Sequence, residues 1–175
     1  MSLSRFAWVS SDPIYIDYHD TEWGNPITGE DALFERISLE GFQAGLSWLT
    51  ILKRREGFRE AFLGFSIDNV AKLSEKDVER LLLNEGIIRH RGKIQAVINN
   101  ARIIKEQNIS LEQIIQKHTP TENRRNLTVS PESTALSKEL RKLGFNFVGP
   151  TTMHAMMQAI GVIQDHEDSC EFRNN

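Results

Sequence analysis

The sequence predicts an all-α fold, on three observations. Apolar side chains recur every three to four residues over most of the chain, which is the period of an amphipathic helix. A Ser or Thr is repeatedly followed three residues later by an acidic residue or a glutamine, and glycines stand where the apolar pattern stops. Alternating apolar and polar runs are nearly absent, and the segment from Ile14 to Ile16 is too short to form a strand.

The first expected helix spans residues 31–44. A capping-type spacing that begins at Thr28 opens it, and Gly45 ends it. Glu40 falls on the apolar face of this helix. Because burying an unpaired carboxylate is costly, we expect Glu40 to be either paired or functional.

The later helices follow from the same signals, with expected ranges 47–62, 66–73, 74–84, 91–105, 110–117, 131–143 and 151–160. Residues 119–131 are polar and contain two prolines, which is typical of an exposed loop. We expect one domain over residues 1–175, which could consist of two small helical lobes around a cleft.

Composition excludes several classes of protein. No apolar stretch is long enough to span a bilayer, and the N-terminus lacks the pattern of a signal peptide. A single cysteine, Cys170, excludes an internal disulfide and is typical of a reducing cytoplasm. We therefore expect a cytoplasmic protein without a membrane partner, and a monomer because no long apolar stripe is evident.

The charge pattern leaves two alternatives. The formal net charge of −3 does not mark a nucleic-acid-binding protein. Two local basic runs are compatible with a polyanion bound on one face, although solvated helix faces are the more ordinary explanation. The runs comprise Lys53, Arg54, Arg55 and Arg59, and then Arg89, Arg91, Lys93, Arg102 and Lys105.

The tryptophans and tyrosines are confined to one part of the chain. All three tryptophans and both tyrosines lie within residues 8–48, whereas phenylalanine is scattered. Their flat apolar faces and polar handles suit a flat, polar ligand, and Glu40 lies in the same segment. Core packing is the alternative for each tryptophan taken alone. The five residues are Trp8, Tyr15, Tyr18, Trp23 and Trp48.

A short turn from Phe147 to Thr151 separates the last two expected helices. Gly149 lets the backbone approach a ligand, and the amides of the following helix N-terminus can donate to an anion. Such a turn can bind a DNA phosphate without a basic side chain. An ordinary helix–helix connection is the alternative.

Short strings of residues occur in order from residue 8 to residue 170. They are Trp8-Val9-Ser10, Asp12-Pro13, Tyr15, Tyr18-His19-Asp20, Glu22-Trp23-Gly24, Leu39-Glu40-Gly41, Gln43-Ala44-Gly45-Leu46-Ser47-Trp48, Gly86-Ile87-Ile88-Arg89-His90-Arg91-Gly92-Lys93-Ile94, Leu136-Ser137-Lys138, Gly144-Phe145, Phe147-Val148-Gly149 and Asp165-His166. Through these strings the chain resembles the 3-methyladenine DNA glycosylase I family, within the helix-hairpin-helix superfamily of repair glycosylases. The resemblance covers essentially the whole chain, and it implies a helical bundle of that superfamily with the base pocket in a cleft. The loop around residues 119–131 is shorter than the family usually has.

The resemblance implies base-excision repair: hydrolysis of the N-glycosidic bond of N3-methyladenine in alkylated double-stranded DNA, with free 3-methyladenine as product. An enzyme that acts on a base within a duplex must flip that base into a pocket. Methylation at N3 makes the base cationic, and aromatic faces and a carboxylate stabilise a cation. The methylated base is already a good leaving group, so selective binding can supply much of the catalysis.

The resemblance also implies roles for individual pocket residues. Glu40 accepts a hydrogen bond from the exocyclic amine of the adenine, and Glu40 and Tyr18 are the catalytic residues. Trp48 is the platform on which the base stacks. The alternative for Glu40 is a buried helix cap or ion pair. The remaining pocket residues are Tyr15, Trp23 and Trp8, of which Trp8 could serve packing alone.

Two turns are implied to contact the DNA. Gly45 and Leu46 match the stretch that approaches the duplex, where Leu46 could fill the gap left by the flipped base. A core leucine is the alternative for Leu46. Gly149 and Thr151 match the hairpin. The basic residues expected to contact phosphate are Arg89, Arg91 and Lys93.

Many relatives in the superfamily carry a hairpin lysine that forms a Schiff base and cleaves the strand. This chain has Pro150 and Thr151 there, which predicts a monofunctional glycosylase. Asp165 and Asp168 lie near the place where the superfamily often has a catalytic aspartate. The 3-methyladenine family lacks that aspartate, so neither is assigned the role, and Asp165 is expected to serve structure.

The family carries a structural zinc held by two cysteines and two histidines. His19, His166 and Cys170 match three ligands, but the fourth position falls at Phe6. Phenylalanine cannot bind zinc, and structural zinc sites are usually four-coordinate. Zinc could be retained with water or another group as a fourth ligand, bind weakly or be absent. His19 could instead be a hydrogen-bonded structural histidine. No organic cofactor is expected.

Two other functions remain open from the sequence. A binding module of the same fold would recognise alkylated DNA without excising the base. A small helical interaction protein would have no DNA role and no salt-dependent DNA affinity. The presence of both Glu40 and Trp48 favours the enzyme over these alternatives.

Overall fold

The computed structural model describes residues 9–122, 124–165 and 170. Within these residues the chain forms ten α-helices and one 3-10 helix, and none of them lies in a strand, so the predicted all-α class is confirmed. In order, the helices are α1 (Pro13–Thr21), α2 (Glu30–Gln43), α3 (Trp48–Lys53), α4 (Arg55–Ala61), η1 (Leu63–Phe65), α5 (Ile67–Val70), α6 (Glu75–Leu81), α7 (Arg91–Glu106), α8 (Leu111–Lys117), α9 (Pro131–Leu143) and α10 (Pro150–Ala159).

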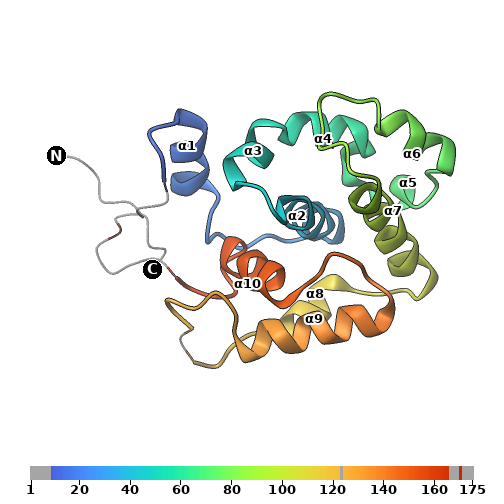
Figure 1. Ribbon diagram of the computed structural model, residues 1–175. Coiled ribbons are helices and arrows are strands. Elements are labelled where there is room, and N and C mark those ends of the chain that lie inside the picture. Colours follow the sequence, from blue (N-terminus) through green and yellow to red (C-terminus); the bar gives the residue numbers. More distant parts are fainter. Residues whose placement is uncertain (1–8, 123, 166–169, 171–175) are drawn as a thin grey trace.

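Helix α2 lies at the centre of the structure, with α1, α3 and α4 on one side of it and α8, α9 and α10 on the other (Figure 1). It packs against α3, α5, α7, α8, α10 and η1. Its residues Leu33, Phe34 and Ile37 are buried in an apolar cluster that extends from Tyr18 to Ile163. Helix α2 therefore supports functional groups that arrive from both sides. The prediction of one domain over residues 1–175 stays a prediction.

Most expected helices are confirmed to within a few residues. Ser47, Ser110 and Ser130 each accept a hydrogen bond from a backbone amide in the first turn of the helix that follows. Ser74 and Asp77 form a capping box at the start of α6.

Three local expectations were wrong. The segment after Asp12 forms α1, capped by the Asp12 side chain with Pro13 in its first turn; isoleucines and tyrosines concealed this short helix. Helix α2 begins without a side-chain cap, so Thr28 does not open it. The helix expected over residues 47–62 breaks at Arg54 into α3 and α4.

Helices α9 and α10 form the hairpin that the turn at Gly149 predicts. Gly144 ends α9 in the left-handed region at φ 106°, and Gly149 is the N-cap of α10. Helix α10 packs against both α9 and α2. A Cβ added at Gly41 of α2 would lie 3.3 Å from the carbonyl oxygen of Phe147, so this glycine allows the hairpin turn to approach α2 closely.

Candidate active site

Helices α1, α2, α3 and α10 surround a cavity of about 490 Å³, and residues 126–128 and Asp165 complete its wall. Glu40 lines it together with four of the five aromatic residues predicted to form a pocket: Tyr15, Tyr18, Trp23 and Trp48. The fifth, Trp8, lies outside the described residues. Lining residues that the sequence did not single out are Gln43, Asn126, Leu127, Thr128, His154, Ala155 and Gln158.

Glu40 is the buried acid of this cavity. It is 4% exposed, and among the described residues its carboxylate has no hydrogen-bond or ion-pair partner. Burial raises the pKa of Glu40 to about 7, against the positive charge of Arg36, which lowers it. Among the described residues, Glu40 therefore forms neither the helix cap nor the ion pair that the sequence left open. Its carboxylate is available to a ligand.

Arg36 is a buried cation that the sequence did not reveal. It precedes Glu40 by one turn of α2 and donates a hydrogen bond of 2.8 Å from Nη1 to the hydroxyl of Tyr18. Its guanidinium carbon lies 5.4 Å from the ring centroids of both Tyr18 and Trp48. Nη2 of Arg36 lies 3.8 Å from Oε2 of Glu22. The spacing of four residues between Arg36 and Glu40 was the available signal, but it is equally typical of an exposed helical ion pair.

The aromatic wall is held in a definite geometry. The rings of Tyr18 and Trp48 lie 5.5 Å apart at an interplanar angle of 45°. Trp23 stacks against His19 at 6.1 Å and 14°. Burial, and then the charge of Glu40, raise the pKa of Tyr15, so the phenol and the carboxylate share one environment.

A groove of about 380 Å³ adjoins the cavity and shares Glu40, Gln43, Thr151 and Ala155 with its lining. Gly45 and Leu46, in the turn between α2 and α3, also line this groove. Gly45 has φ 81°, which favours glycine. Leu46 is 38% exposed, so the alternative of a core leucine is excluded. The structure thus places Leu46 and Thr151 at one groove beside the cavity.

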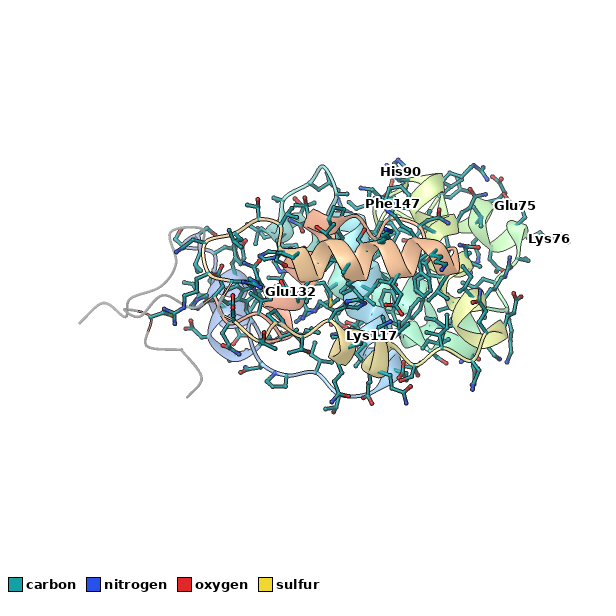
Figure 2. All side chains as sticks on the ribbon, turned by 90° about the horizontal axis from the view of Figure 1, so that it is seen from below. Glu75, Lys76, His90, Lys117, Glu132 and Phe147 are labelled. Carbon is teal, nitrogen blue, oxygen red and sulfur yellow. The ribbon has the colours of Figure 1, made fainter. Side chains whose placement is uncertain are left out.

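The hairpin turn also presents an exposed aromatic side chain. Phe147 has φ 56° and packs edge-on against His90 at 6.1 Å, where the start of α7 meets the hairpin (Figure 2). His90 caps α7 by accepting a hydrogen bond from the amide of Lys93. Gly149 leaves the first amides of α10 without a side-chain cap. These amides suit a phosphate.

The three basic residues expected to contact phosphate differ in position. Arg89 is exposed, and Arg91 is exposed but paired with Glu75 and Glu79 at 2.8 and 2.6 Å. The expectation for Lys93 is corrected, because this residue is only 7% exposed. Its Nζ donates to the carbonyls of Phe42 and Ala44 at 2.9 and 2.6 Å. Lys93 therefore holds the C-terminal end of α2 and the turn that carries Leu46.

Asp165 lines the cavity with both carboxylate oxygens engaged. Oδ1 accepts from the amide of Asn126 at 2.9 Å, and Oδ2 accepts from Nε2 of Gln158 at 2.7 Å. These bonds tie the loop of residues 126–128 to α10, in keeping with a structural role. Asp168 lies outside the described residues.

His19 and Cys170 meet beside the cavity. Nε2 of His19 lies 3.8 Å from Sγ of Cys170, and Nδ1 lies 2.8 Å from Oδ1 of Asp20. In a tetrahedral site with Zn–N of about 2.0 Å and Zn–S of about 2.3 Å, two such ligand atoms lie about 3.5 Å apart. A zinc-bound histidine usually gives its other N–H to a carboxylate, as Asp20 allows. The pair therefore fits two ligands of one zinc ion.

The other proposed zinc positions, His166 and Phe6, lie outside the described residues. In the part of the chain that the structure describes, no group of three or more His, Cys, Asp or Glu side chains could hold a metal ion.

Comparisons with known proteins agree with this geometry. The profile of the methyladenine glycosylase family matches residues 8–174. The chain is 48% identical to DNA-3-methyladenine glycosylase 1 of Escherichia coli (strain K12), with 96% of each chain covered. It is 43% identical to DNA-3-methyladenine glycosylase of Haemophilus influenzae, with 95% of this chain and 96% of that protein covered.

Two solved structures are similar over nearly the whole length. A crystal structure of 3-methyladenine DNA glycosylase I has a TM-score of 0.91 at 46% identity, and covers 96% of this chain and 98% of that chain. A variant of 3-methyladenine DNA glycosylase I in complex with 3-methyladenine has a TM-score of 0.88 at 33% identity, with 97% of each chain covered.

An all-α fold with a hairpin of helices beside an aromatic, acidic cavity defines the class of DNA glycosylases that flip their base. Within that class, the chain belongs to the methyladenine glycosylase family. The family and the fold predicted from the ordered strings are confirmed.

Proposed function

We propose that this protein excises 3-methyladenine from alkylated DNA in base-excision repair, by hydrolysing the N-glycosidic bond of the flipped base. The buried, unpaired carboxylate of Glu40 among four aromatic side chains carries the proposal. The bacterial relatives bear the name DNA-3-methyladenine glycosylase, and one related structure holds 3-methyladenine.

Charge explains how the cavity would discriminate. Before cleavage the methylated base is a cation, whereas an undamaged adenine is neutral. In a buried site the cation favours the ionised form of Glu40, because opposite charges attract strongly at low dielectric. The ring faces of Trp48 and Tyr18 add to this attraction. A neutral base gains neither contribution.

The bond changes need no proton donor. Water attacks C1′ of the deoxyribose while the bond from C1′ to N9 breaks, and the bonding electron pair neutralises the base as it leaves. The attacking water loses a proton to the solvent as C1′ gains a hydroxyl group. Glu40 accepts from the exocyclic amine and Trp48 stacks on the ring, so these residues act by binding the cationic base.

Alkylated double-stranded DNA is the proposed macromolecular partner, and free 3-methyladenine is the released product. Leu46 fills the gap that the flipped base leaves in the duplex. The amides after Gly149 and the hydroxyl of Thr151 face the sugar-phosphate backbone of the DNA. Arg89 supplies exposed positive charge, and Arg91 is exposed beside it but paired with Glu75 and Glu79. No lysine is found among the described residues that line the cavity, in keeping with a glycosylase that leaves the strand uncut.

We also propose that His19, Cys170 and His166 bind a structural zinc ion with a fourth ligand other than position 6. When bound, zinc would tie α1 to the C-terminal tail, next to Trp23. Metal analysis of protein purified without chelator or histidine tag tests this. Less than about 0.2 equivalents of zinc would refute the site.

We propose that the protein acts as a monomer in the cytoplasm. In the described parts of the chain, no helix has the length and apolar character needed to cross a membrane.

The decisive test of the proposed function is incubation with methylated duplex DNA, followed by chromatography of the released bases. We expect 3-methyladenine to appear faster than from DNA alone, and the Glu40→Gln variant to lose most of this activity while remaining folded. Binding of methylated DNA without release would instead establish the non-catalytic binding module. Full activity of Glu40→Gln would refute the role of Glu40.

A further inference from the structure

Leu127 is a large apolar side chain in the cavity lining to which neither the sequence nor the proposed function assigns a role. It is 41% exposed, so it lies at the rim of the cavity and not at its inner end. The exposed residues among those described in the lining are Asn126, Leu127, Thr128 and Thr151. All of them except Leu127 carry a polar group. An exposed leucine is ordinary by itself, but a leucine in the lining of a ligand cavity is placed to contact a ligand.

The loop that carries Leu127 is fixed to α10. The amide of Asn126 donates to Oδ1 of Asp165 at 2.9 Å, and Nε2 of Gln158 on α10 donates to Oδ2 at 2.7 Å. Asn126 itself has φ 62°, in the left-handed region. Figure 1 shows the loop between α8 and α9 at the end of the molecule where α1 lies. Asp165 thus holds the backbone next to Leu127 in a defined position.

The depth of Glu40 indicates which edge of the flipped base meets this rim. Glu40 is 4% exposed, so the exocyclic amine that it binds, on C6 of the base, lies at the inner end of the cavity. N9 is still bonded to the deoxyribose and therefore faces the mouth. N3 lies across the six-membered ring from C6, and N3 and N9 are both bonded to C4. The methyl group on N3 therefore lies beside the sugar, at the rim.

We propose that Leu127 packs against the N3-alkyl group of the flipped base and thereby limits the size of the alkyl group that the protein accepts. This inference rests on the proposed function. A methyl group neither donates nor accepts a hydrogen bond, so apolar contact and fit are the means of recognising it. A leucine that closes on a methyl group leaves little space for a longer chain, and overpacking is costly.

The contact also adds to the discrimination against undamaged adenine. Without an alkyl group on N3, the base leaves the apolar surface of Leu127 in water, and the contribution of that burial is lost. Glu40 and the aromatic faces select the charge of the methylated base. Leu127 selects its shape, at the opposite edge of the ring.

Shortening the side chain tests the contact. Leu127→Ala opens a space at the rim that accommodates a longer alkyl group. With duplex DNA carrying 3-methyladenine or 3-ethyladenine, we expect the variant to lower kcat/KM for 3-methyladenine about fourfold or more. The ratio of kcat/KM for 3-ethyladenine to that for 3-methyladenine should rise about tenfold.

Val129 provides the matched control. It is 38% exposed in the same loop and is not among the described residues that line the cavity. Val129→Ala should leave both values of kcat/KM within about threefold of the wild type. If Leu127→Ala slows release of both lesions by one factor, or Val129→Ala changes the ratio as Leu127→Ala does, the inference is overturned. The first result would show a contact with the DNA backbone, and the second a general loosening of the loop.

A second measurement does not depend on turnover. In NMR spectra of the wild type saturated with free 3-methyladenine, we expect cross-relaxation between the N-methyl protons of the base and the methyl protons of Leu127. Cross-relaxation of the base with Trp48 but not with Leu127 overturns the contact.

Failure of the proposed function would look different. In that case the wild type itself releases no 3-methyladenine. A wild type that releases it, with a Leu127→Ala variant of unchanged lesion ratio, overturns the role of Leu127 alone.

Discussion

The guanidinium of Arg36 donates a 2.8 Å hydrogen bond to the phenol of Tyr18 from behind the cavity wall. The same group lies 5.4 Å from the centroid of the Trp48 ring, so one buried cation supports two aromatic side chains. Its charge favours the ionised form of Glu40, one turn further along α2. The cavity thus contains an acid whose ionised form burial disfavours and a cation outside the cavity partly restores.

The ionisation of Glu40 should control the pH dependence of excision. Burial raises the pKa of Glu40 to about 7, and only the ionised carboxylate attracts the cationic base. We expect kcat/KM to be constant above this pH and to fall about tenfold per pH unit below it. Initial rates of 3-methyladenine release at subsaturating DNA, on both sides of neutrality, measure this. A profile that stays flat well below neutrality would contradict the raised pKa.

The same pKa has a consequence for stability. A folded-state pKa of about 7 against an ordinary value of 4.5 contributes stability below 4.5, and this contribution is lost as the pH rises through 7. At about 1.4 kcal/mol per unit, the loss is on the order of 3 kcal/mol. We therefore expect Glu40→Gln to be more stable than the wild type above pH 7 and similar to it below 4.5. Urea unfolding in both pH ranges measures the difference; an equal difference in both would rule out this origin.

Arg36 should affect the pH below which kcat/KM falls. Because its charge lowers the pKa of Glu40, Arg36→Met should move the rising limb of kcat/KM to higher pH, with activity at neutral pH reduced and partly recovered in alkaline buffer. Arg36→Lys is the matched control, because it keeps the charge but lacks the planar group that supports Tyr18 and Trp48. The rising limb of kcat/KM should move less in Arg36→Lys than in Arg36→Met. A uniform loss at every pH in both variants would show a role in packing only.

The helices and part of the site could be predicted from the sequence because their signals are local. Ser74 and Asp77 are three residues apart, and their capping box forms as the spacing indicates. Glu40 stood out because a carboxylate on an apolar helix face needs an explanation, and the ordered strings connected it to Trp48.

The roles of Arg36, Lys93 and Leu127 depend on distant partners and could not be predicted. The hydrogen bond from Arg36 spans 18 positions, those from Lys93 span 51 and 49, and the one that fixes the loop of Leu127 to Asp165 spans 39. Lys93 belongs to a basic run that indicated DNA binding. Its ammonium group instead donates hydrogen bonds to carbonyls at the end of α2. Neither the residue composition nor the spacing along the sequence indicates such tertiary contacts.

Lys93 and Arg89 should therefore behave differently when replaced. Lys93→Met removes the hydrogen bonds to the carbonyls of Phe42 and Ala44, of which the first is buried. It should lower the free energy of unfolding by about 2 kcal/mol, without changing the slope of log Kd for DNA against log salt. Arg89→Ala should leave stability within about 0.5 kcal/mol and reduce that slope by about 1. Measuring the DNA affinity of both variants over a range of salt concentrations distinguishes the two roles. A reduced slope for Lys93→Met at full stability would restore it as a phosphate contact.

Leu46 should stabilise the opened duplex and should not affect binding of the base in the cavity. It is 38% exposed in the turn that Lys93 braces, so Leu46→Ala should change the free energy of unfolding by less than about 0.5 kcal/mol. Unstacking a base step costs a few kcal/mol, and a side chain that fills the gap offsets part of it. We therefore expect Leu46→Ala to lower kcat/KM on double-stranded methylated DNA about tenfold or more.

The matched substrate for Leu46→Ala is methylated single-stranded DNA, where no partner strand closes on the flipped base. Release from that substrate, and the affinity for free 3-methyladenine, should stay within about threefold of the wild type. If single and double strands lose activity equally, Leu46 shapes the groove beside Glu40 and does not fill a gap in the duplex. The duplex-specific loss is the expected outcome because Leu46 lines the groove beside the cavity, as Thr151 also does, but does not line the cavity itself.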